Sequence, residues 1–297
     1  MRHADEFGFD PVQPTVDLRR VMACVGEAVE RVYAFETPEK LSEEGVDVHM
    51  DAARFEDPHT LVVGEQTRIG ADQILPCSGA RAAHPTVPGL AATPHWTYES
   101  VWQQEHLPQH LLVVGSGPVG IELTQAFARF GSALTVFERD DRPLKVADPE
   151  ASSVLRRVLE QEAVEFRVGA RVDGVQRRGN VVLVTDRDED VEGDALVVAL
   201  GRRPVVSGLD LERAGVAYTE RGIQVDEHLR TSQKHIFACG DVIGSFQFTH
   251  YATWQASMAI RTMLFPGSTR GLLEGVMPRH PRNLACQAAI DWATGKA

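Results

Sequence analysis

Six residues in the middle of the chain have the spacing of a loop that surrounds phosphate groups. Residues 115–120 read Gly-Ser-Gly-Pro-Val-Gly, and they lie between an apolar strand-like segment and an apolar-periodic helical segment. In such a strand–turn–helix unit, Gly115 allows the tight turn, Gly117 lets the backbone approach a pyrophosphate, and Gly120 lets the helix pack closely on the strand. Amide N–H groups at the start of the helix then face the phosphates. This pattern predicts a dinucleotide-binding site.

Glu138 stands where a bound dinucleotide would need an acceptor for its adenosine ribose. It ends the next apolar segment, about 20 residues after the glycine turn, which is the spacing that this type of site requires. A carboxylate there accepts hydrogen bonds from the ribose hydroxyls and repels a 2′-phosphate, so it favours NAD(H) over NADP(H). The neighbouring Arg139 weakens this discrimination because a guanidinium attracts phosphate. A solvated loop acid is the alternative interpretation of Glu138.

A second group of polar residues follows a strand-like segment nearer the C-terminus. Asp241 comes directly after Gly240, and an aspartate in that position can bind a sugar-alcohol hydroxyl. Taken alone, Gly240-Asp241 is weak evidence for a ligand site, because Gly-Asp is a common turn dipeptide. Thr249 and His250 begin a helical pattern whose free N–H groups favour negative charge. These residues are therefore candidates for binding a second ligand.

The cysteines do not have the spacing of a metal site or of a local redox pair. No two of them form a C-x-x-C or a closer pair. We expect isolated reduced thiols, and no metal. The four cysteines are Cys24, Cys77, Cys239 and Cys286.

The apolar pattern also predicts the elements that must position these residues. A strand–helix–strand order between residues 111 and 201 predicts an α/β fold with a parallel, doubly wound sheet. A proline-rich segment at 81–94 is typical of a connector between domains. Helices are predicted at 15–36, 118–130, 149–162 and 249–264. Strands are predicted at 46–50, 60–63, 73–75, 111–114, 134–137, 195–201, 223–225 and 235–238, with turns at 57–59 and 63–65 and a solvated hairpin end at 186–190.

Composition excludes some classes of partner. The 297 residues carry a formal net charge of −12, which is unsuited to a general binder of nucleic acid or of an anionic membrane surface. No apolar run approaches the roughly 20 residues of a membrane-spanning helix. The first residues lack the apolar core of a secretory signal. We expect a cytoplasmic protein with small-molecule ligands.

Taken together, these motifs and several shorter ones resemble the pyridine nucleotide–disulfide oxidoreductases, and most closely the mercuric reductase-like branch, near dihydrolipoyl dehydrogenase. These proteins are flavoproteins. The likeness follows the family's order from about residue 5 to residue 279. The shorter markers are residues 57–60, Ser78-Gly79 with 87–90, 148–150, 201–204, 236–242, Thr249-His250 and 265–266.

The resemblance implies a Rossmann-like NAD(P)-binding domain inserted in an FAD-binding domain. On this basis we expect residues 1–104 and 223–266 to form the FAD-binding domain, without its N-terminal βαβ unit. Residues 105–222 would form the NAD(P)-binding domain. The family is homodimeric through a C-terminal domain, in whose place residues 267–297 form a divergent tail.

The resemblance also assigns roles by position. The glycine turn would hold the NAD(P)H pyrophosphate, and Glu122 matches a family glutamate near the nicotinamide. Asp241 matches the aspartate that binds the flavin ribitol. The helix begun by Thr249 and His250 would point its positive end at the flavin pyrimidine edge. The remaining positions in cofactor-binding turns are Gly79, Gly201 and Gly240.

The sequence departs from the family in ways that bear on function. It contains neither the earlier G-x-G-x-x-G that binds the FAD pyrophosphate nor the C-x-x-x-x-C redox pair. Residues 77–79 read Cys-Ser-Gly where the family has Ala-Thr-Gly. Cys77 and Cys239 both stand at strand ends near the expected flavin, but we do not expect them to pair, because both lie in cofactor-binding turns.

Three functions remain open. The first is an FAD-dependent NAD(P)H oxidoreductase, present as a fragment, that passes a hydride from NADH to flavin and then to an unknown small-molecule acceptor. The second is a catalytically inactive, decayed homologue. The third is an NAD(H)-binding module that acts with a partner chain. For this chain we expect NAD(H) binding, weak or absent FAD binding, and no disulfide or mercuric ion reduction.

Overall fold

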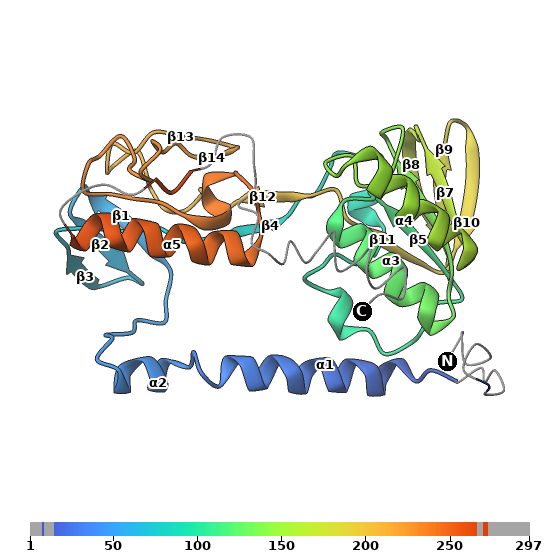
Figure 1. The fold of residues 1–297 in the computed structure, drawn as a ribbon, viewed down its shortest axis with the longest axis horizontal. Helices are drawn as coiled ribbons and strands as arrows, with labels where there is room; N and C mark the ends of the chain where they lie inside the picture. Colours follow the sequence, from blue (N-terminus) through green and yellow to red (C-terminus); the bar gives the residue numbers. More distant parts are fainter. Residues whose placement is uncertain (1–7, 9–14, 266–269, 273–297) are drawn as a thin grey trace. The chain divides into compact units, whose positions relative to one another are not determined.

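The computed structural model describes residues 8, 15–265 and 270–272, and these fall into two compact units (Figure 1). Unit 1 contains the described residues up to Lys40 together with His84–Leu200. Unit 2 contains Leu41–Ala83 and the described residues from Gly201 onward. Apart from 270–272, the predicted tail lies outside the described residues. Among the helices described, none is long and apolar enough to cross a membrane.

Unit 1 is built around a parallel sheet, as the sequence predicts. Its strands lie in the order β11-β5-β6-β7, and every neighbouring pair is parallel. The predicted helices at 118–130 and 149–162 are confirmed, the second to within one residue. The elements are β5 (His110–Val114), α3 (Pro118–Phe130), β6 (Ala133–Glu138), α4 (Pro149–Gln161), β7 (Val164–Val168) and β11 (Ala195–Val198).

The apolar run in β5 is buried because both faces of the sheet are covered. Leu111 and Val113 belong to one core cluster, which includes Phe127 of α3. Leu112 and Val114 belong to a second cluster, on the opposite side of the strand. A continuous apolar run, rather than an alternating one, is what a strand buried on both faces requires.

An antiparallel sheet contributes to the second cluster of unit 1. Its strands are β8 (Val172–Arg178), β9 (Val181–Asp186) and β10 (Glu189–Gly193). Arg187 and Asp188 join β9 to β10 with φ values of +49° and +68°. Positive φ at both central residues is the requirement of a type I′ hairpin turn. The predicted hairpin end is confirmed, but Asp186 is buried rather than solvated, because its carboxylate accepts a hydrogen bond from the Arg171 N–H.

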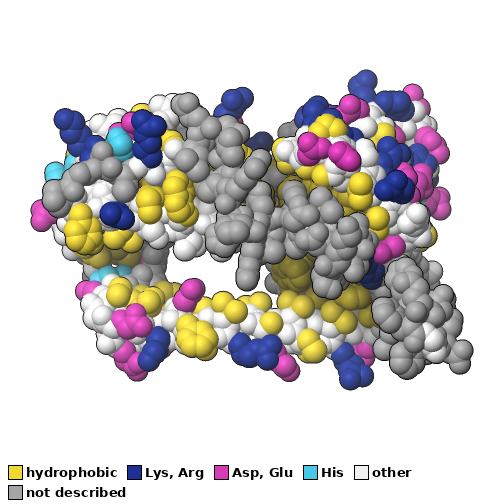
Figure 2. Space-filling model, in the orientation of Figure 1, with side chains coloured by type: hydrophobic (Ala, Val, Ile, Leu, Met, Phe, Trp, Pro, Cys, Tyr) yellow, Lys and Arg dark blue, Asp and Glu magenta, His cyan; other side chains and the backbone are white. Residues whose placement is uncertain are grey.

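The first long helix belongs to unit 1. Asp17 caps α1 (Leu18–Tyr33), and its carboxylate accepts a hydrogen bond from the Arg19 N–H at 3.1 Å. Leu18 is buried in the core of unit 1. Farther along, Val29 and Val32 are exposed, and hydrophobic side chains are visible on the surface of this helix in Figure 2. The short helix α2 (Pro38–Glu43) follows.

Unit 2 is assembled from small sheets and one long helix, which matches the predicted 249–264. Its core includes Phe55, Leu211 and Ile236. The elements of unit 2 are β1 (Ala53–Asp57), β2 (Thr60–Val63), β3 (Thr67–Gly70), β4 (Ala80–Ala82), β12 (Arg202–Pro204), β13 (Tyr218–Thr219), β14 (Gly222–Ile223) and α5 (Thr249–Leu264). The short 3₁₀ helices are η2 (Leu90–Ala92) and η3 (Val101–Gln103) in unit 1 and η4 (Gly240–Ile243) in unit 2.

Several predicted strands are corrected by the structure. Residues 46–50 form no strand, because alternation alone supplies no neighbouring strand to pair with. The segments at 73–75 and 235–238 are reduced to isolated bridges, of which Ile74 with Ile236 is parallel. The strand predicted at 195–201 ends at Val198, shortly before Gly201 takes a φ of +96°.

The compact units divide the chain at positions other than the predicted domain boundaries. Leu90 belongs to a core cluster of unit 1, so the segment before residue 105 packs with that unit. In unit 2, β12 pairs with β4, which places residues 202–204 there. The ranges 1–104, 105–222 and 223–266 stay a prediction about which cofactor each part binds.

Candidate functional site

The glycine turn at the end of β5 needs two of its glycines for the packing of the chain itself. Gly115 has a φ of +102°, and a Cβ added there would lie 2.5 Å from the carbonyl oxygen of Ala199. A Cβ on Gly120 would lie 2.2 Å from the carbonyl oxygen of Gly115. The Gly115 N–H donates to the Phe137 carbonyl at 2.9 Å, which ties the turn to the end of β6.

Gly117 differs from the other two glycines, because no packing contact among the described residues excludes a side chain there. It is the N-cap of α3 with a φ of −66°, and no atom lies within 4 Å of an added Cβ. It makes no side-chain cap for the helix, and Pro118 follows it. Open space beside the positive end of a helix is where a phosphate fits. The turn therefore fits the pyrophosphate of a dinucleotide.

Glu138 lies beside this turn, as the sequence predicts. Its Oε2 accepts hydrogen bonds from the Ser116 N–H at 3.0 Å and from the Ser116 hydroxyl. Its Oε1 accepts from the Asp140 N–H at 2.8 Å. These bonds fix the half-buried carboxylate between the glycine turn and the loop after β6. A solvated, unattached acid is not what the structure shows.

Ser116 was not among the predicted site residues. It is fully buried, and both its N–H and its hydroxyl donate to Glu138. Its position between Gly115 and Gly117 is the one signal that could have identified it. Because Ser116 donates to Glu138, the turn and the acid form one hydrogen-bonded unit.

The charge of Glu138 has no cationic partner in the part of the chain that is described. Arg139 is exposed, and Lys145 is bound to Asp140 with an N–O distance of 2.6 Å. The hydrogen bond from Lys145 lowers the pKa of Asp140. No cationic side chain among the described residues therefore competes with a ligand for the carboxylate of Glu138.

Glu122 lies on α3, two residues after Gly120. The side chain as a whole is exposed, but the protein around its carboxyl disfavours the charged form and raises the pKa of Glu122. This carboxyl keeps its proton to a higher pH than an ordinary glutamate. Such a group can hold or exchange a proton next to the glycine turn.

In unit 2, Asp241 lies in η4 and is bound by a cation of the chain itself. Its Oδ2 lies 2.8 Å from Nη1 of Arg202, and the two side chains are 16% and 27% exposed. Arg202 also donates to the carbonyl of Gln247. The charge of Asp241 is thus compensated within the protein.

The start of α5 lies next to η4. The Gly240 N–H donates to the buried side chain of Gln255 at 2.9 Å. A Cβ on Gly240, whose φ is +76°, would lie 3.3 Å from Cβ of Ala252. Thr249 and His250 are exposed, and the helix has no side-chain N-cap. The structure therefore brings together the predicted residues at 240–241 and at 249–250.

Gly79 and Gly201 both adopt positive φ in open surroundings. Their φ values are +72° and +96°, and an added Cβ would meet nothing within 4 Å at either position. The Gly79 carbonyl accepts a hydrogen bond from the Val205 N–H at 2.9 Å. Both glycines are required by the backbone conformation, since L side chains rarely adopt it.

The expectation of isolated cysteines is wrong for Cys77 and Cys239. Their sulfur atoms lie 3.4 Å apart. The two residues come from segments that are far apart in sequence, so no local spacing could reveal the pair. Each cysteine lies three residues after a member of the bridged pair Ile74 and Ile236. This equal spacing in sequence would have indicated the contact, had the pairing of the two segments been known.

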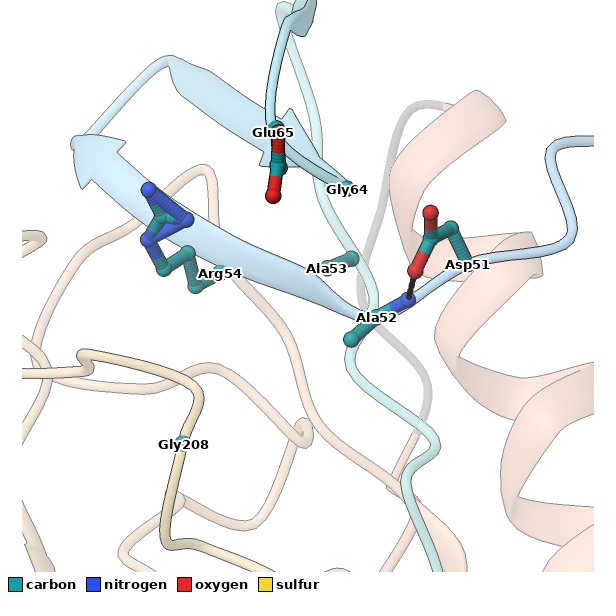
Figure 3. A pocket seen from close by; sticks show the side chains of 7 residues that line it. All are labelled: Asp51, Ala52, Ala53, Arg54, Gly64, Glu65 and Gly208. Carbon is teal, nitrogen blue, oxygen red and sulfur yellow. Dashed lines mark hydrogen bonds between the residues drawn. The ribbon is translucent and has the colours of Figure 1, made fainter.

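The hollow drawn in Figure 3 lies in unit 2 and is lined by none of the predicted site residues. It has a volume of about 430 Å³, and its charged side chains are Asp51, Arg54 and Glu65. Asp51 accepts a hydrogen bond from the N–H of Ala52, the bond drawn there.

Within the described residues, no group of three or more His, Cys, Asp or Glu side chains could hold a metal ion.

The parallel sheet and its glycine turn define an α/β protein of the type that binds FAD or NAD. The family model for the pyridine nucleotide-disulphide oxidoreductases matches residues 15–256. The chain therefore belongs to that family, and the resemblance noted from the sequence is confirmed.

Known relatives are similar along most of this chain but are longer. The chain is 30% identical to mercuric reductase of Streptomyces lividans, with 92% of this chain and 59% of that protein covered. It is 29% identical to dihydrolipoyl dehydrogenase of Bacillus subtilis, with 87% and 58% covered. The solved structure of the HOCl-induced flavoprotein disulfide reductase RclA from Escherichia coli matches with a TM-score of 0.81 and 28% identity, covering 86% and 60%. The chain thus spans about 60% of the length of these relatives.

Proposed function

We propose that unit 1 binds NADH through its glycine turn, in preference to NADPH, as the nicotinamide half of an FAD-dependent oxidoreductase. The family uses FAD and NAD(P)H. The observation that carries the proposal is Glu138, held by N–H and O–H donors alone, beside a turn in which a Cβ added to Gly117 would meet no described atom within 4 Å. The electron acceptor under this proposal is a small molecule of unassigned identity.

The residues of unit 1 have separate tasks in this proposal. A bound nicotinamide supplies a hydride. The N–H groups at the start of α3 hold the pyrophosphate, which approaches over Gly117. Glu138 accepts hydrogen bonds from the ribose hydroxyls and excludes a 2′-phosphate by charge repulsion. Glu122 is a group that can take up or release a proton near the turn, because desolvation of its carboxyl raises its pKa.

An NAD(H)-binding module that acts with another chain is the second candidate. The observation that favours it lies in unit 2, where the Arg202 guanidinium already binds the carboxylate of Asp241 at 2.8 Å. A flavin hydroxyl would compete with a charge-assisted hydrogen bond for that acceptor. A chain that retains NADH but not flavin would fit this second candidate.

Titration of the full chain with NADH and with NADPH tests the proposal. We expect saturable NADH binding and a preference over NADPH of about 10-fold to 100-fold, because charge repulsion in a partly screened site contributes about 1–3 kcal/mol. Glu138→Ala should narrow that preference by weakening NADH binding and admitting the 2′-phosphate. Nicotinamide fluorescence measures both affinities.

The matched control is Glu192→Ala, which removes an exposed glutamate of β10 in the same unit. It should leave both affinities unchanged. A folded chain without saturable NADH binding would refute the proposal. Equal affinities for the two cofactors in the unaltered chain would show that Arg139 outweighs Glu138.

A further inference from the structure

Two cysteines of unit 2 occupy equivalent positions on neighbouring segments that run in the same direction. Ile74 and Ile236 are parallel bridge partners, and Cys77 and Cys239 each lie three residues farther along. Phe237 donates its N–H to the Ile74 carbonyl at 2.8 Å, so the backbones remain paired along this stretch. Adjacent strands lie about 4.7–4.9 Å apart, within the range of Cα separations that disulfides span.

The sulfur atoms face one another. Their separation is 3.4 Å, so a shift of little more than 1 Å would bring them to the S–S bond length of about 2.05 Å. The side chain of Cys77 is exposed, whereas that of Cys239 is 2% exposed. Cys77 is therefore the residue of the pair that is accessible to a dissolved reagent, and Cys239 is shielded from it.

We propose that Cys77 and Cys239 form a reversible intramolecular disulfide, with Cys77 as the sulfur that reacts first with a small peroxide or a low-molecular-weight disulfide. Neither residue is needed for the proposed binding of NADH by unit 1. The proposal therefore stands or fails independently of that function.

The protonation of the pair supports this order of events. The hydrogen bond from Cys239 lowers the pKa of Cys77. The same interaction, together with burial, raises the pKa of Cys239. The thiolate is the nucleophilic form of cysteine, so the exposed sulfur is also the more reactive one.

With hydrogen peroxide the oxidation proceeds in two balanced steps. The Cys77 thiolate attacks one peroxide oxygen, the O–O bond breaks, and the released hydroxide takes up a proton as water, leaving a sulfenic acid on Cys77. The Cys239 sulfur then attacks the Cys77 sulfur and displaces the hydroxyl group, which leaves as a second water with the Cys239 proton. Two thiols have lost two electrons to the peroxide, and one S–S bond has formed. A dithiol reductant reverses the change by thiol–disulfide exchange.

The test uses the full chain with Cys24 and Cys286 replaced by serine, so that the proposed pair holds the two remaining thiols. Cys24 is exposed on α1, and Cys286 lies outside the described residues. Peroxide should remove both thiols together, and mass spectrometry of the unreduced chain should show the loss of two hydrogen atoms. A peptide map should join the peptides of Cys77 and Cys239, and dithiothreitol should restore both thiols.

Two variants in that background separate the proposal from ordinary oxidation. Cys77→Ser should leave the buried thiol unreactive toward the same peroxide concentration. Cys239→Ala should let Cys77 proceed to sulfinic acid or to a mixed disulfide. Because Cys239 is buried, its replacement could unfold the chain, so circular dichroism must establish that Cys239→Ala is folded. The peptide map of the unaltered chain tests the disulfide without any variant.

The disulfide should also raise the thermal unfolding midpoint. It would join residues 162 positions apart, which restricts the unfolded chain. Formation should be independent of protein concentration, since both sulfurs belong to one chain. Oxidation of Cys77 alone, with Cys239 still a thiol in the unaltered chain, would overturn the proposal, and so would a cross-link that joins two chains.

Discussion

Unit 1 and unit 2 each hold a carboxylate close to a glycine turn, Glu138 at the end of β6 and Asp241 directly after Gly240, and the two carboxylates have different partners. Glu138 accepts hydrogen bonds from Ser116 and from the backbone of Asp140, and these donors are uncharged. Asp241 is bound by the Arg202 guanidinium. Uncharged donors orient a carboxylate and leave its net charge in place, whereas a guanidinium neutralises that charge.

This difference separates a turn that is prepared for a ligand from one that is closed by the chain itself. In unit 1, the space beside Gly117 is open, because none of the described residues comes within 4 Å of an added Cβ. In unit 2, the Gly240 N–H is already used by Gln255. Two glycine turns, each with an acidic residue nearby, can therefore differ in how much of their binding capacity remains for a cofactor.

The largest expected effect is a difference in cofactor retention between the two units. The purified chain, incubated with excess FAD and then passed through gel filtration, should retain flavin far below one per chain. Each charge-assisted hydrogen bond that a flavin must do without costs about 1.5–3 kcal/mol, and the chain contains one G-x-G-x-x-G turn. Flavin absorbance and NADH fluorescence measured on the same sample give the comparison.

Retention of flavin by the purified chain would remove the predicted difference in cofactor binding between the two units. Stoichiometric yellow flavin after gel filtration would mean that Arg202 gives up Asp241 when FAD binds. It would also favour the oxidoreductase over the NAD(H)-binding module. NADH binding by a colourless chain would favour the module.

The next effect distinguishes the glycines within the turn of unit 1. Gly120→Ala should destabilise the chain by about 1–3 kcal/mol and abolish NADH binding, because its Cβ would lie 2.2 Å from the Gly115 carbonyl oxygen. Gly117→Ala should leave the thermal unfolding midpoint nearly unchanged, since its Cβ meets no atom within 4 Å. It should nevertheless weaken NADH binding, because the pyrophosphate must approach over that position.

The two alanine variants thus control for each other. Thermal unfolding followed by circular dichroism measures stability, and NADH titration measures binding. If Gly117→Ala bound NADH as tightly as the unaltered chain, the open space beside α3 would not be the phosphate site.

Local features of the fold could be predicted from the sequence. The bounds of α5 agree with the prediction because its apolar pattern is long and ends just before Pro266. The parallel sheet of unit 1 followed from continuous apolar runs that alternate with amphipathic helices. The position of Glu138 beside the turn followed from its place at the end of β6.

Pairings between distant segments could not be predicted in this way. Residues 46–50 alternate like a strand but have no partner, so they stay irregular. The contact between Cys77 and Cys239 depends on the bridge between Ile74 and Ile236. The ion pair of Arg202 with Asp241 likewise depends on tertiary structure, since the two residues lie 39 positions apart.

The smallest expected effect concerns a third carboxyl group, Glu122, whose pKa is shifted by desolvation of the carboxyl rather than by a charged or hydrogen-bonded partner. Its pKa in the folded state is raised above the ordinary value of 4.5. The folded state is therefore relatively most stable below that pH, and this advantage is lost as the pH rises through the raised value. Glu122→Gln should remove that loss and stabilise the chain at neutral pH by a few tenths of a kcal/mol, because the side chain is exposed.

Urea unfolding at pH 4 and at pH 7 measures this difference. Glu122→Gln and the unaltered chain should be closer in stability at the lower pH, where the carboxyl of Glu122 is protonated in a larger share of molecules. Glu192→Gln on β10 controls for the loss of one negative charge from a chain whose net charge is −12. If Glu192→Gln had the same pH-dependent effect, net charge would explain it. If only Glu122→Gln showed the pH-dependent change in stability, the protein around the Glu122 carboxyl would be the cause. That result would distinguish Glu122 from Glu138 and Asp241, whose carboxylates are held by hydrogen-bond donors.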